Sequence, residues 1–393
     1  MSRNIEKNAT IAVVGAGTMG RGIAQVAATA GHTVLLYDTY ADALEDAKEF
    51  LDYILNRQVE KERMSQEEVD AILGRIHFEE DMTNFGDCEL VIEAIIEDLD
   101  AKTDTFARIE GIVPRDCIIA SNTSSLSIAS LSSALKKPQR MMGIHFFNPA
   151  PLMPLVEIVP AIVTSDETLK TARSLIDEWG KTTVQAKDTP GFIVNRVARP
   201  FYGEALRIYE EGIADFATID WAMKELGGFR MGPFELMDFI GNDINYKVTE
   251  TVFEAFYYDP RYKPSFTQKR HVEAGWLGKK TDRGFYDYRD NANPAKPIKD
   301  EQLGKRILNR ILIMLINEAA DALHLNIASR DDIDLAMTKG VNYPKGLLKW
   351  ADEIGIKRCL ARMDELSDKY REDRYRASAQ LRKMAEQSET FYD

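Results

Sequence analysis

The feature that most constrains the fold is a glycine-rich loop set between a strand-like run and a helix-like run. Thr10–Val14 is apolar and β-branched, Gly15-Ala-Gly-Thr-Met-Gly20 follows, and Met19–Ala30 has the composition of a helix. The first glycine permits a tight turn, the second lets a ligand approach the backbone, and the third lets the helix pack on the strand. This pattern predicts a β-α-β unit whose helix N-terminus offers N–H groups to a pyrophosphate. The alternative is a glycine turn that binds nothing.

The first half of the chain alternates between strand-like and helix-like runs. Strands are predicted at residues 10–14, 33–37, 90–94, 118–120, 141–145, 156–159 and 182–185, and a long amphipathic helix at residues 41–58. Strands that alternate with helices imply a parallel sheet covered on both faces. The predicted fold class is therefore α/β. A Rossmann-type doubly wound sheet over residues 1–187 precedes two tandem all-α repeats.

The two helical repeats are visible as an internal duplication. After Asp188 strand-like runs become sparse and helical patterns dominate. The predicted repeats cover residues 188–290 and 301–393, with a proline-containing linker between them. A shift of 114 residues without gaps gives 14 identities over the 47 positions 195–241. About 3 would be expected by chance from average residue usage. The pairs include Asn195-Arg196 with Asn309-Arg310.

Composition and charge exclude several classes of protein. The chain has 393 residues, 45% of them hydrophobic, and no run of about 18 apolar residues such as a membrane-spanning helix requires. Fifty basic against 63 acidic residues give a net charge of −13, which argues against a general nucleic-acid surface. The three cysteines lie far apart, so neither a disulfide framework nor a zinc site is indicated. With no signal peptide at the N-terminus, we expect a cytoplasmic protein without a bound metal.

Two further motifs carry chemistry. Asp38 ends the second strand, where a carboxylate accepts from the ribose 2′-hydroxyl of NAD and repels the 2′-phosphate of NADP. His145 ends a short strand, and Glu157 lies twelve residues later in the next one, so the pair can meet across neighbouring strands. An imidazole backed by a carboxylate is a usual general base. A buried structural ion pair is the alternative.

The run Gly143-Ile-His-Phe-Phe-Asn-Pro-x-Pro-x-Met-x-Leu-Val-Glu-Ile, with Ser121-Asn-Thr-Ser-Ser upstream and Pro190-Gly-Phe-Ile-Val-Asn-Arg downstream, resembles the L-3-hydroxyacyl-CoA dehydrogenase family. The resemblance covers about residues 9–288. It implies NAD-dependent, reversible oxidation of 3-hydroxyacyl-CoA to 3-ketoacyl-CoA.

The resemblance also implies roles for particular residues. His145 would be the catalytic base and Glu157 its partner, while Ser124 and Asn195 would line the substrate site. The cofactor contacts it implies, together with those of the glycine loop, are Gly15, Gly17, Thr18, Met19, Gly20, Asp38, Glu97, Lys102, Ser124, Asn148 and Lys280. An N-cap role competes for Ser124. A packing role competes for Asn195, because its repeat counterpart Asn309 has no nucleotide domain nearby in the sequence.

The chain departs from the family pattern in two places. Asp282 stands where the family usually has glycine, which puts the reach of Lys280 in question. The second repeat is additional. In two-domain members the helical domain pairs with that of another subunit, so we expect Glu301–Asp393 to pack on the first repeat within one chain and replace that partner.

The CoA contacts and the function class leave alternatives open. Arg57 and Lys61 lie four residues apart, with Arg63 nearby, and are candidates for the 3′-phosphate of CoA, although a solvated charged face also fits. Dehydrogenases of acids such as 6-phosphogluconate share the architecture, but use a lysine and lack the His-Phe-Phe-Asn-Pro motif. A non-catalytic dinucleotide-binding protein, like the lens crystallins that resemble this family, is the remaining alternative.

Overall fold

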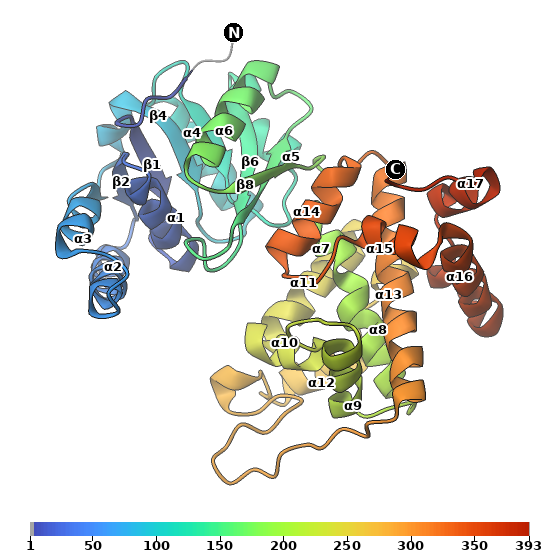
Figure 1. The fold of residues 1–393 in the computed structure, drawn as a ribbon. Coiled ribbons are helices and arrows are strands. Elements are labelled where there is room, and N and C mark those ends of the chain that lie inside the picture. The colour runs from blue at the N-terminus through green and yellow to red at the C-terminus, as the bar shows by residue number, and fades with distance from the viewer. Residues whose placement is uncertain (1–3, 393) are drawn as a thin grey trace. The chain divides into compact units, whose positions relative to one another are not determined.

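The computed structural model describes residues 4–392, and the chain divides between Thr189 and Pro190 into two compact units (Figure 1). The first unit contains one sheet built from β1 (Thr10–Val14), β2 (Thr33–Tyr37), β3 (Ile76–Glu79), β4 (Cys88–Glu93), β5 (Ile118–Ser121), β6 (Met141–Phe146), β7 (Leu155–Pro160) and β8 (Thr182–Gln185). The strand order is β3-β2-β1-β4-β5-β6-β7-β8. The predicted α/β class is confirmed.

The sheet is mixed, and this corrects the prediction of a wholly parallel one. Every neighbouring pair is parallel except β6 and β7, which run antiparallel. The connection over residues 147–154 is too short for a parallel crossover, which needs roughly a dozen residues. The short edge strand β3 was not predicted.

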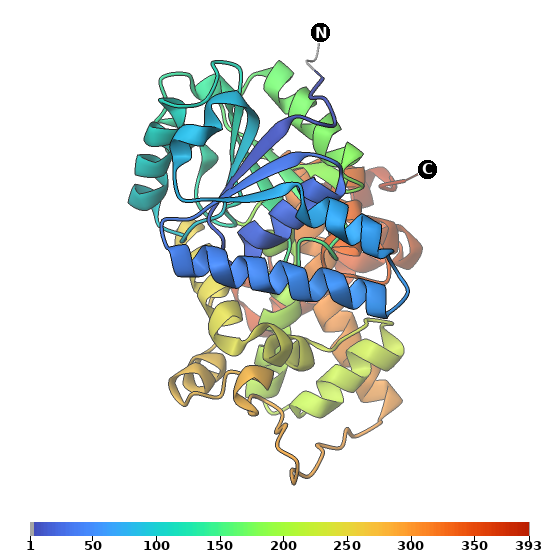
Figure 2. The same cartoon turned by 90° about the vertical axis from the view of Figure 1, so that its left-hand side faces the viewer.

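Helices cover both faces of this sheet. They are α1 (Thr18–Thr29), α2 (Ala41–Glu60), α3 (Gln66–Leu73), α4 (Leu99–Glu110), α5 (Ile128–Ser132) and α6 (Asp166–Glu178), with the 3-10 turns η1 (Met82–Asp87) and η2 (Pro138–Arg140). One apolar core joins α1, α2, α3 and α6 to one face of the sheet, whereas α4 and α5 lie outside this core. Figure 2 shows α2 as the long blue helix of this unit.

The second unit is helical. Its first part contains α7 (Val194–Val197), α8 (Arg199–Glu210), α9 (Phe216–Trp221), the π-helix η3 (Ala222–Leu226), α10 (Pro233–Ile240), α11 (Asn242–Ala255), η4 (Pro260–Tyr262), α12 (Phe266–Glu273) and η5 (Lys279–Thr281). Its second part contains α13 (Glu301–His324), α14 (Arg330–Gly340), α15 (Leu347–Ile354), α16 (Ile356–Tyr370), η6 (Asp373–Tyr375) and α17 (Ala379–Gln387). None of the helices described is long and apolar enough to cross a membrane.

Two helical stretches of this unit are interrupted. α7 and α8 are divided at Ala198, two residues before a proline that occupies the first turn of α8. Proline favours a first helical turn and lacks the N–H that a helix interior requires. α9 continues directly into the π-helix η3.

The two parts repeat the same hydrogen bonds at an offset of 114 residues. Asp220 accepts from the backbone N–H groups of Phe234 and Glu235, at 2.9 and 2.8 Å. Its counterpart Asp334 accepts from Leu348 N–H and Lys349 N–H, at 2.9 and 3.0 Å. A tyrosine hydroxyl donates to each carboxylate, from Tyr286 to Asp220 and from Tyr392 to Asp334. Burial raises the pKa of Asp220 to about 7 and also raises that of Asp334.

Ion pairs between the two parts are reciprocal. Arg196 Nε donates to Glu318 at 2.8 Å, and Arg310 Nε donates to Glu204 at 2.9 Å. Arg310 is the counterpart of Arg196, and Glu318 is the counterpart of Glu204. In Figure 1, α8 and α13, which contact one another, lie side by side. We call this contact, with its two reciprocal ion pairs, the seam. All residues of the run Ile311–Ile316 are buried.

Candidate active site

The glycine loop between β1 and α1 has room for a ligand. Gly15 has φ +103°, and a Cβ there would lie 2.6 Å from the Ala94 carbonyl oxygen. A Cβ at Gly20 would overlap the carbonyl of Gly15, so helix packing requires this third glycine. A Cβ at Gly17 would meet no protein atom within 4 Å, so protein packing does not require this glycine. The loop therefore leaves open space beside the N-terminus of α1, which also carries Thr18 and Met19.

The N-terminus of α1 is suited to an anion. Its N-cap, Gly17, supplies no side-chain hydrogen bond, and the first turn contains no acidic residue. Unpaired N–H groups at a helix N-terminus attract phosphate oxygens. The loop thus fits the pyrophosphate of a dinucleotide.

Asp38 is fixed at the end of β2 by the same loop. Its Oδ2 accepts from Ala16 N–H at 2.7 Å, and its Oδ1 accepts from Tyr40 N–H at 3.0 Å. The carboxylate is half-buried, and each of its oxygens has a further lone pair for a ribose hydroxyl.

A charged network of Lys102, Glu93 and Glu97 lies beside the loops that follow β4 and β5, with Lys102 and Glu93 buried and Glu97 exposed. Lys102 on α4 is 1% exposed, and its Nζ lies 2.6 Å from Glu93 Oε1 and 3.3 Å from Glu97 Oε2. Glu93, which was not among the predicted site residues, also accepts from the Ser121 hydroxyl at 2.7 Å. An acidic residue at the end of an apolar strand was the signal that could have identified it. Lys102, expected as a cofactor contact, is engaged with these carboxylates.

Glu97 holds the loop that carries Ser124. Its Oε1 accepts from the Thr123 hydroxyl at 2.6 Å, the Ser124 N–H at 3.1 Å and the Ser125 hydroxyl at 2.9 Å. Burial alone would raise the pKa of Glu97, but Lys102 and these donors lower it below its ordinary value. The negative charge of Glu97 therefore stabilises this loop.

Ser124 itself is half-buried, and its hydroxyl makes no hydrogen bond within residues 4–392. The N-cap of α5 is Ser127, whose hydroxyl accepts from Ser130 N–H. The competing N-cap role for Ser124 is therefore wrong, and its hydroxyl can serve a ligand. Asn148, another expected cofactor contact, is exposed in the loop after β6.

His145 and Glu157 face one another across β6 and β7. The strand register pairs them directly, and His145 Nδ1 lies 2.7 Å from Glu157 Oε2. The histidine is 6% exposed and the glutamate is fully buried. The ring of Phe147 packs on the imidazole at a centroid distance of 4.6 Å. A carboxylate at Nδ1 fixes the orientation and tautomer of the imidazole and directs its Nε2 to a reaction.

Two of the residues predicted to line the site, Asn195 and Lys280, belong to the helical unit. Asn195 lies on α7, half-buried, with its carbonyl accepting from Arg199 Nε. Lys280 lies on η5, and its Nζ is 2.7 Å from Asp243 Oδ2. Asp282 adopts φ +54°, so it takes the left-handed conformation that a glycine would favour, which Asp tolerates better than most residues.

The candidate CoA contacts are at the end of α2. Arg57 donates to the Tyr53 hydroxyl at 3.1 Å and its guanidinium lies 5.5 Å from the centre of that ring. Lys61 and Arg63 are exposed. The local structure brings Arg57 to a tyrosine and leaves the two other cations solvated.

The chain is similar to known proteins over most of its length. Residues 10–189 match the family model for the NAD binding domain of 3-hydroxyacyl-CoA dehydrogenase, and residues 191–288 and 307–390 match that for its C-terminal domain. A 3-hydroxyadipyl-CoA dehydrogenase of Escherichia coli K12 is 37% identical, with 96% of this chain and 97% of the relative covered.

Two other relatives differ in length. A 3-hydroxybutyryl-CoA dehydrogenase of Bradyrhizobium diazoefficiens is 41% identical, over 73% of this chain and 97% of the relative. A crystal structure of 3-hydroxybutyryl-CoA dehydrogenase from Escherichia coli K12 superposes with a TM-score of 0.92 at 35% identity, covering 97% of this chain and 98% of the other. The shorter relative lacks room for a second repeat, whereas the crystal structure spans both.

Proposed function

Because the chain belongs to the 3-hydroxyacyl-CoA dehydrogenase family, we propose that it oxidises (3S)-3-hydroxyacyl-CoA reversibly to 3-ketoacyl-CoA with His145 as the general base. The enzyme is an oxidoreductase, and NAD is its cofactor. The observation that carries the proposal is the 2.7 Å contact between the buried carboxylate of Glu157 and Nδ1 of His145. Such a pair takes up and returns one proton, as oxidation of a secondary alcohol requires.

In the proposed mechanism each residue has one task. Nε2 of His145 accepts the proton of the substrate hydroxyl, and Glu157 stabilises the imidazolium that results. NAD, when bound, accepts the hydride from the substrate carbon. The Ser124 hydroxyl, which has no partner within residues 4–392, donates to the developing ketone oxygen. We assign the same task to Asn195, because it belongs to the family motif that begins at Pro190.

The cofactor residues follow from the same proposal. Gly15, Gly17 and Gly20 admit the pyrophosphate at the N-terminus of α1, and Asp38 binds the adenosine ribose. Glu97 acts by holding the Ser124 loop, and Lys102 by keeping Glu97 charged. Asn148 and Lys280 are retained as cofactor contacts, and Arg57 and Lys61 as CoA contacts, from the resemblance alone.

The domain plan is part of the proposal. Residues 1–187 bind the nucleotide, residues 188–290 complete the substrate side, and residues 301–393 form a second copy without catalysis of its own. We infer that this copy replaces the subunit partner of two-domain relatives, which the reciprocal pairs Arg196–Glu318 and Arg310–Glu204 support. The three cysteines are buried and form no disulfide within residues 4–392, which suits a reducing compartment such as the cytoplasm.

The test is turnover of acetoacetyl-CoA, followed through NADH absorbance. His145→Ala should lower kcat by at least ~100-fold, the lower range for general acid–base catalysis, with NADH affinity retained. His77→Ala, an exposed histidine on β3, is the matched control and should keep native turnover. Near-native turnover by His145→Ala would remove His145 as the base. An inactive native enzyme that still binds NADH would point to the non-catalytic alternative. Comparing kcat/KM for 3-hydroxybutyryl-CoA and 3-hydroxyadipyl-CoA then defines the acyl group.

A further inference from the structure

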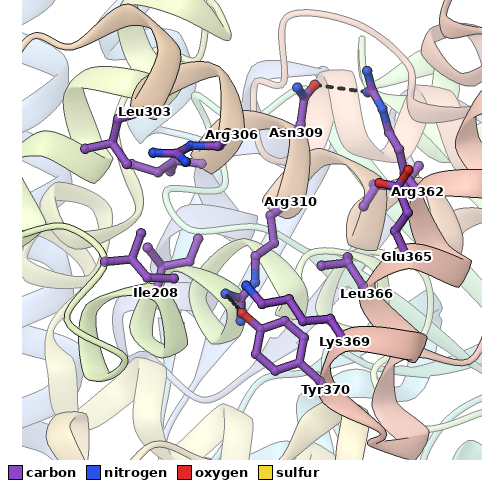
Figure 3. Close-up of a pocket in the computed structure, with 13 residues that line it drawn as sticks. Ile208, Leu303, Arg306, Asn309, Arg310, Arg362, Glu365, Leu366, Lys369 and Tyr370 are labelled. Atoms are coloured by element: carbon purple, nitrogen blue, oxygen red, sulfur yellow. Dashed lines mark hydrogen bonds between the residues drawn. The ribbon is translucent and has the colours of Figure 1, made fainter.

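The helical unit contains a cavity of about 530 Å³ that the proposed reaction does not use. It is lined by residues of α8, α13 and α16 and by Ile213, just after α8. Figure 3 shows the lining side chains, with Arg306 and Asn309 on one helix and Arg362 and Lys369 on another. A cavity of 300–1,000 Å³ is a usual size for a small-molecule site.

The lining has an apolar part and a cationic part. Ile208, Leu303, Ile307 and Leu366 supply aliphatic surface from three helices. Arg306, Arg362 and Lys369 supply positive charge, and Glu365 is the carboxylate that lines the cavity with them. These four charges leave an excess of two positive charges (3 − 1), although the whole chain carries −13.

The cations are available to a ligand. Arg306 is exposed and makes no hydrogen bond or ion pair within residues 4–392. Arg362 is half-buried and donates from one guanidinium nitrogen to Asn309 Oδ1 at 3.0 Å, which orients the group and leaves other N–H donors. Lys369 lies over the Tyr370 ring. Arg310, which also lines the cavity, is already neutralised by Glu204 and Glu211.

Two of these cations are particular to the second repeat. The 114-residue offset places Val248 and Ala255 at the positions of Arg362 and Lys369. The offset holds along α11 and α16, because each begins directly after a positive-φ glycine, Gly241 and Gly355. Packing of the repeat therefore does not demand a cation at either of these positions. Their clustering with Arg306 around one cavity suits an anionic ligand.

We propose that this cavity is a second binding site, separate from the catalytic one, for an anionic acyl ligand: a short apolar chain that carries a negatively charged group. The chain lies against Ile208, Leu303 and Leu366. The charged group pairs with Arg306 and Arg362, since charge-assisted hydrogen bonds to a guanidinium suit carboxylates and phosphates equally. The proposal goes beyond the proposed reaction and does not depend on it.

Calorimetric titration of the full-length protein tests this site, with octanoate, octanoyl-CoA and CoA as probes. The double variant Arg306→Gln/Arg362→Gln should weaken octanoate or octanoyl-CoA binding at one site by at least tenfold, while NADH affinity stays within twofold of the native value. Arg358→Gln, an exposed change on the same helix outside the lining, is the matched control and should bind like the native protein.

Comparing the three probes also identifies whether the anionic group belongs to a free acid or to a CoA thioester. If octanoate binds and CoA does not compete, the ligand is a free acid; if only octanoyl-CoA binds, with one site fewer in the double variant, it is the thioester. Leu366→Trp, which fills the apolar end of the cavity, is a second variant and should show the same loss of binding. It tests the site even if the double variant is poorly folded. Equal binding of every probe by the native protein and both variants, including no binding by any, would overturn the proposal. Sedimentation that shows the double variant to split a native oligomer would also overturn it, because another chain would then occupy the cavity.

Discussion

Replacing Arg310 by methionine should destabilise the helical unit strongly. Arg310 donates to Glu204 at 2.9 Å and to both oxygens of Glu211, and Glu204 is only 3% exposed. Removing one member of a buried ion pair typically costs about 3–5 kcal/mol, because the other charge is left uncompensated. For a unit of this size each kcal/mol shifts Tm by about 2–4 °C. We therefore expect Tm to fall by roughly 6–20 °C in calorimetry.

The fall in Tm caused by Arg310→Met should depend on pH. Burial raises the pKa of Glu204 even with Arg310 beside it, and removing the arginine raises this pKa further. A carboxyl whose folded pKa is raised stabilises the fold at low pH and loses that contribution as pH rises through the folded pKa. The Tm difference between Arg310→Met and the native protein should thus shrink as pH is lowered.

Controls separate the seam from a general effect of lost charge. Arg358→Met, on an exposed position of α16, should change Tm little, whereas Arg196→Met should resemble Arg310→Met because its pair is the counterpart. Replacing both partners, Arg310→Met with Glu204→Met, should restore part of the loss, since the buried Glu204 charge is then gone and Arg374, which lies 4.0 Å from Glu204, keeps its pair with Glu372. A fall of under 1 °C in the single variant, or a double variant worse than the sum of its singles, would refute this reasoning.

Four other outcomes are expected. Asp38 should give at least tenfold higher kcat/KM with NAD than with NADP, equivalent to ~1.4 kcal/mol, and equal use of both cofactors would show that it does not contact the ribose. Asn309→Ala should lower Tm and leave turnover unchanged; lost turnover with native Tm would assign the second repeat a catalytic part. Truncation after Arg289 should expose the seam, so that sedimentation detects dimers or precipitate rather than a stable monomer. Glu97→Gln should be less stable than the native enzyme at neutral pH, with the difference vanishing as pH falls through the lowered pKa of Glu97, and a pH-independent difference would contradict the charge assignment.

Sequence reasoning succeeded where local periodicity decides the structure. β1, β2 and β8 begin and end at the predicted residues, because each is a compact β-branched run beside a turn. It failed at β3, a four-residue edge strand in which only Ile76 is buried. It also missed the antiparallel β6–β7 pair, although the short connection between the strands contains that information.

The site shows a similar division. The contact between His145 and Glu157 was anticipated because the two residues lie in neighbouring predicted strands, whereas the antiparallel register that pairs them directly was not anticipated. The burial of Lys102 against Glu93 was not anticipated, because a helix residue and a strand residue meet there only through tertiary packing. The cavity beside α16 has no sequence signature either, since its cations become a cluster only when α13 and α16 lie together.

The exposed connection over residues 291–300 gives the seam a property that two separate chains would lack. These ten residues join the two repeats, which pair through Arg196–Glu318 and Arg310–Glu204. The association of the repeats is therefore unimolecular. For a short flexible tether the local concentration of one partner around the other is in the millimolar range. Dilution of the enzyme therefore leaves the seam intact, whereas an equivalent contact between subunits would come apart at low expression. Because the two repeats are separate stretches of one chain, a substitution in one repeat changes only one side of the seam. Each repeat is therefore free to acquire side chains that the other does not carry.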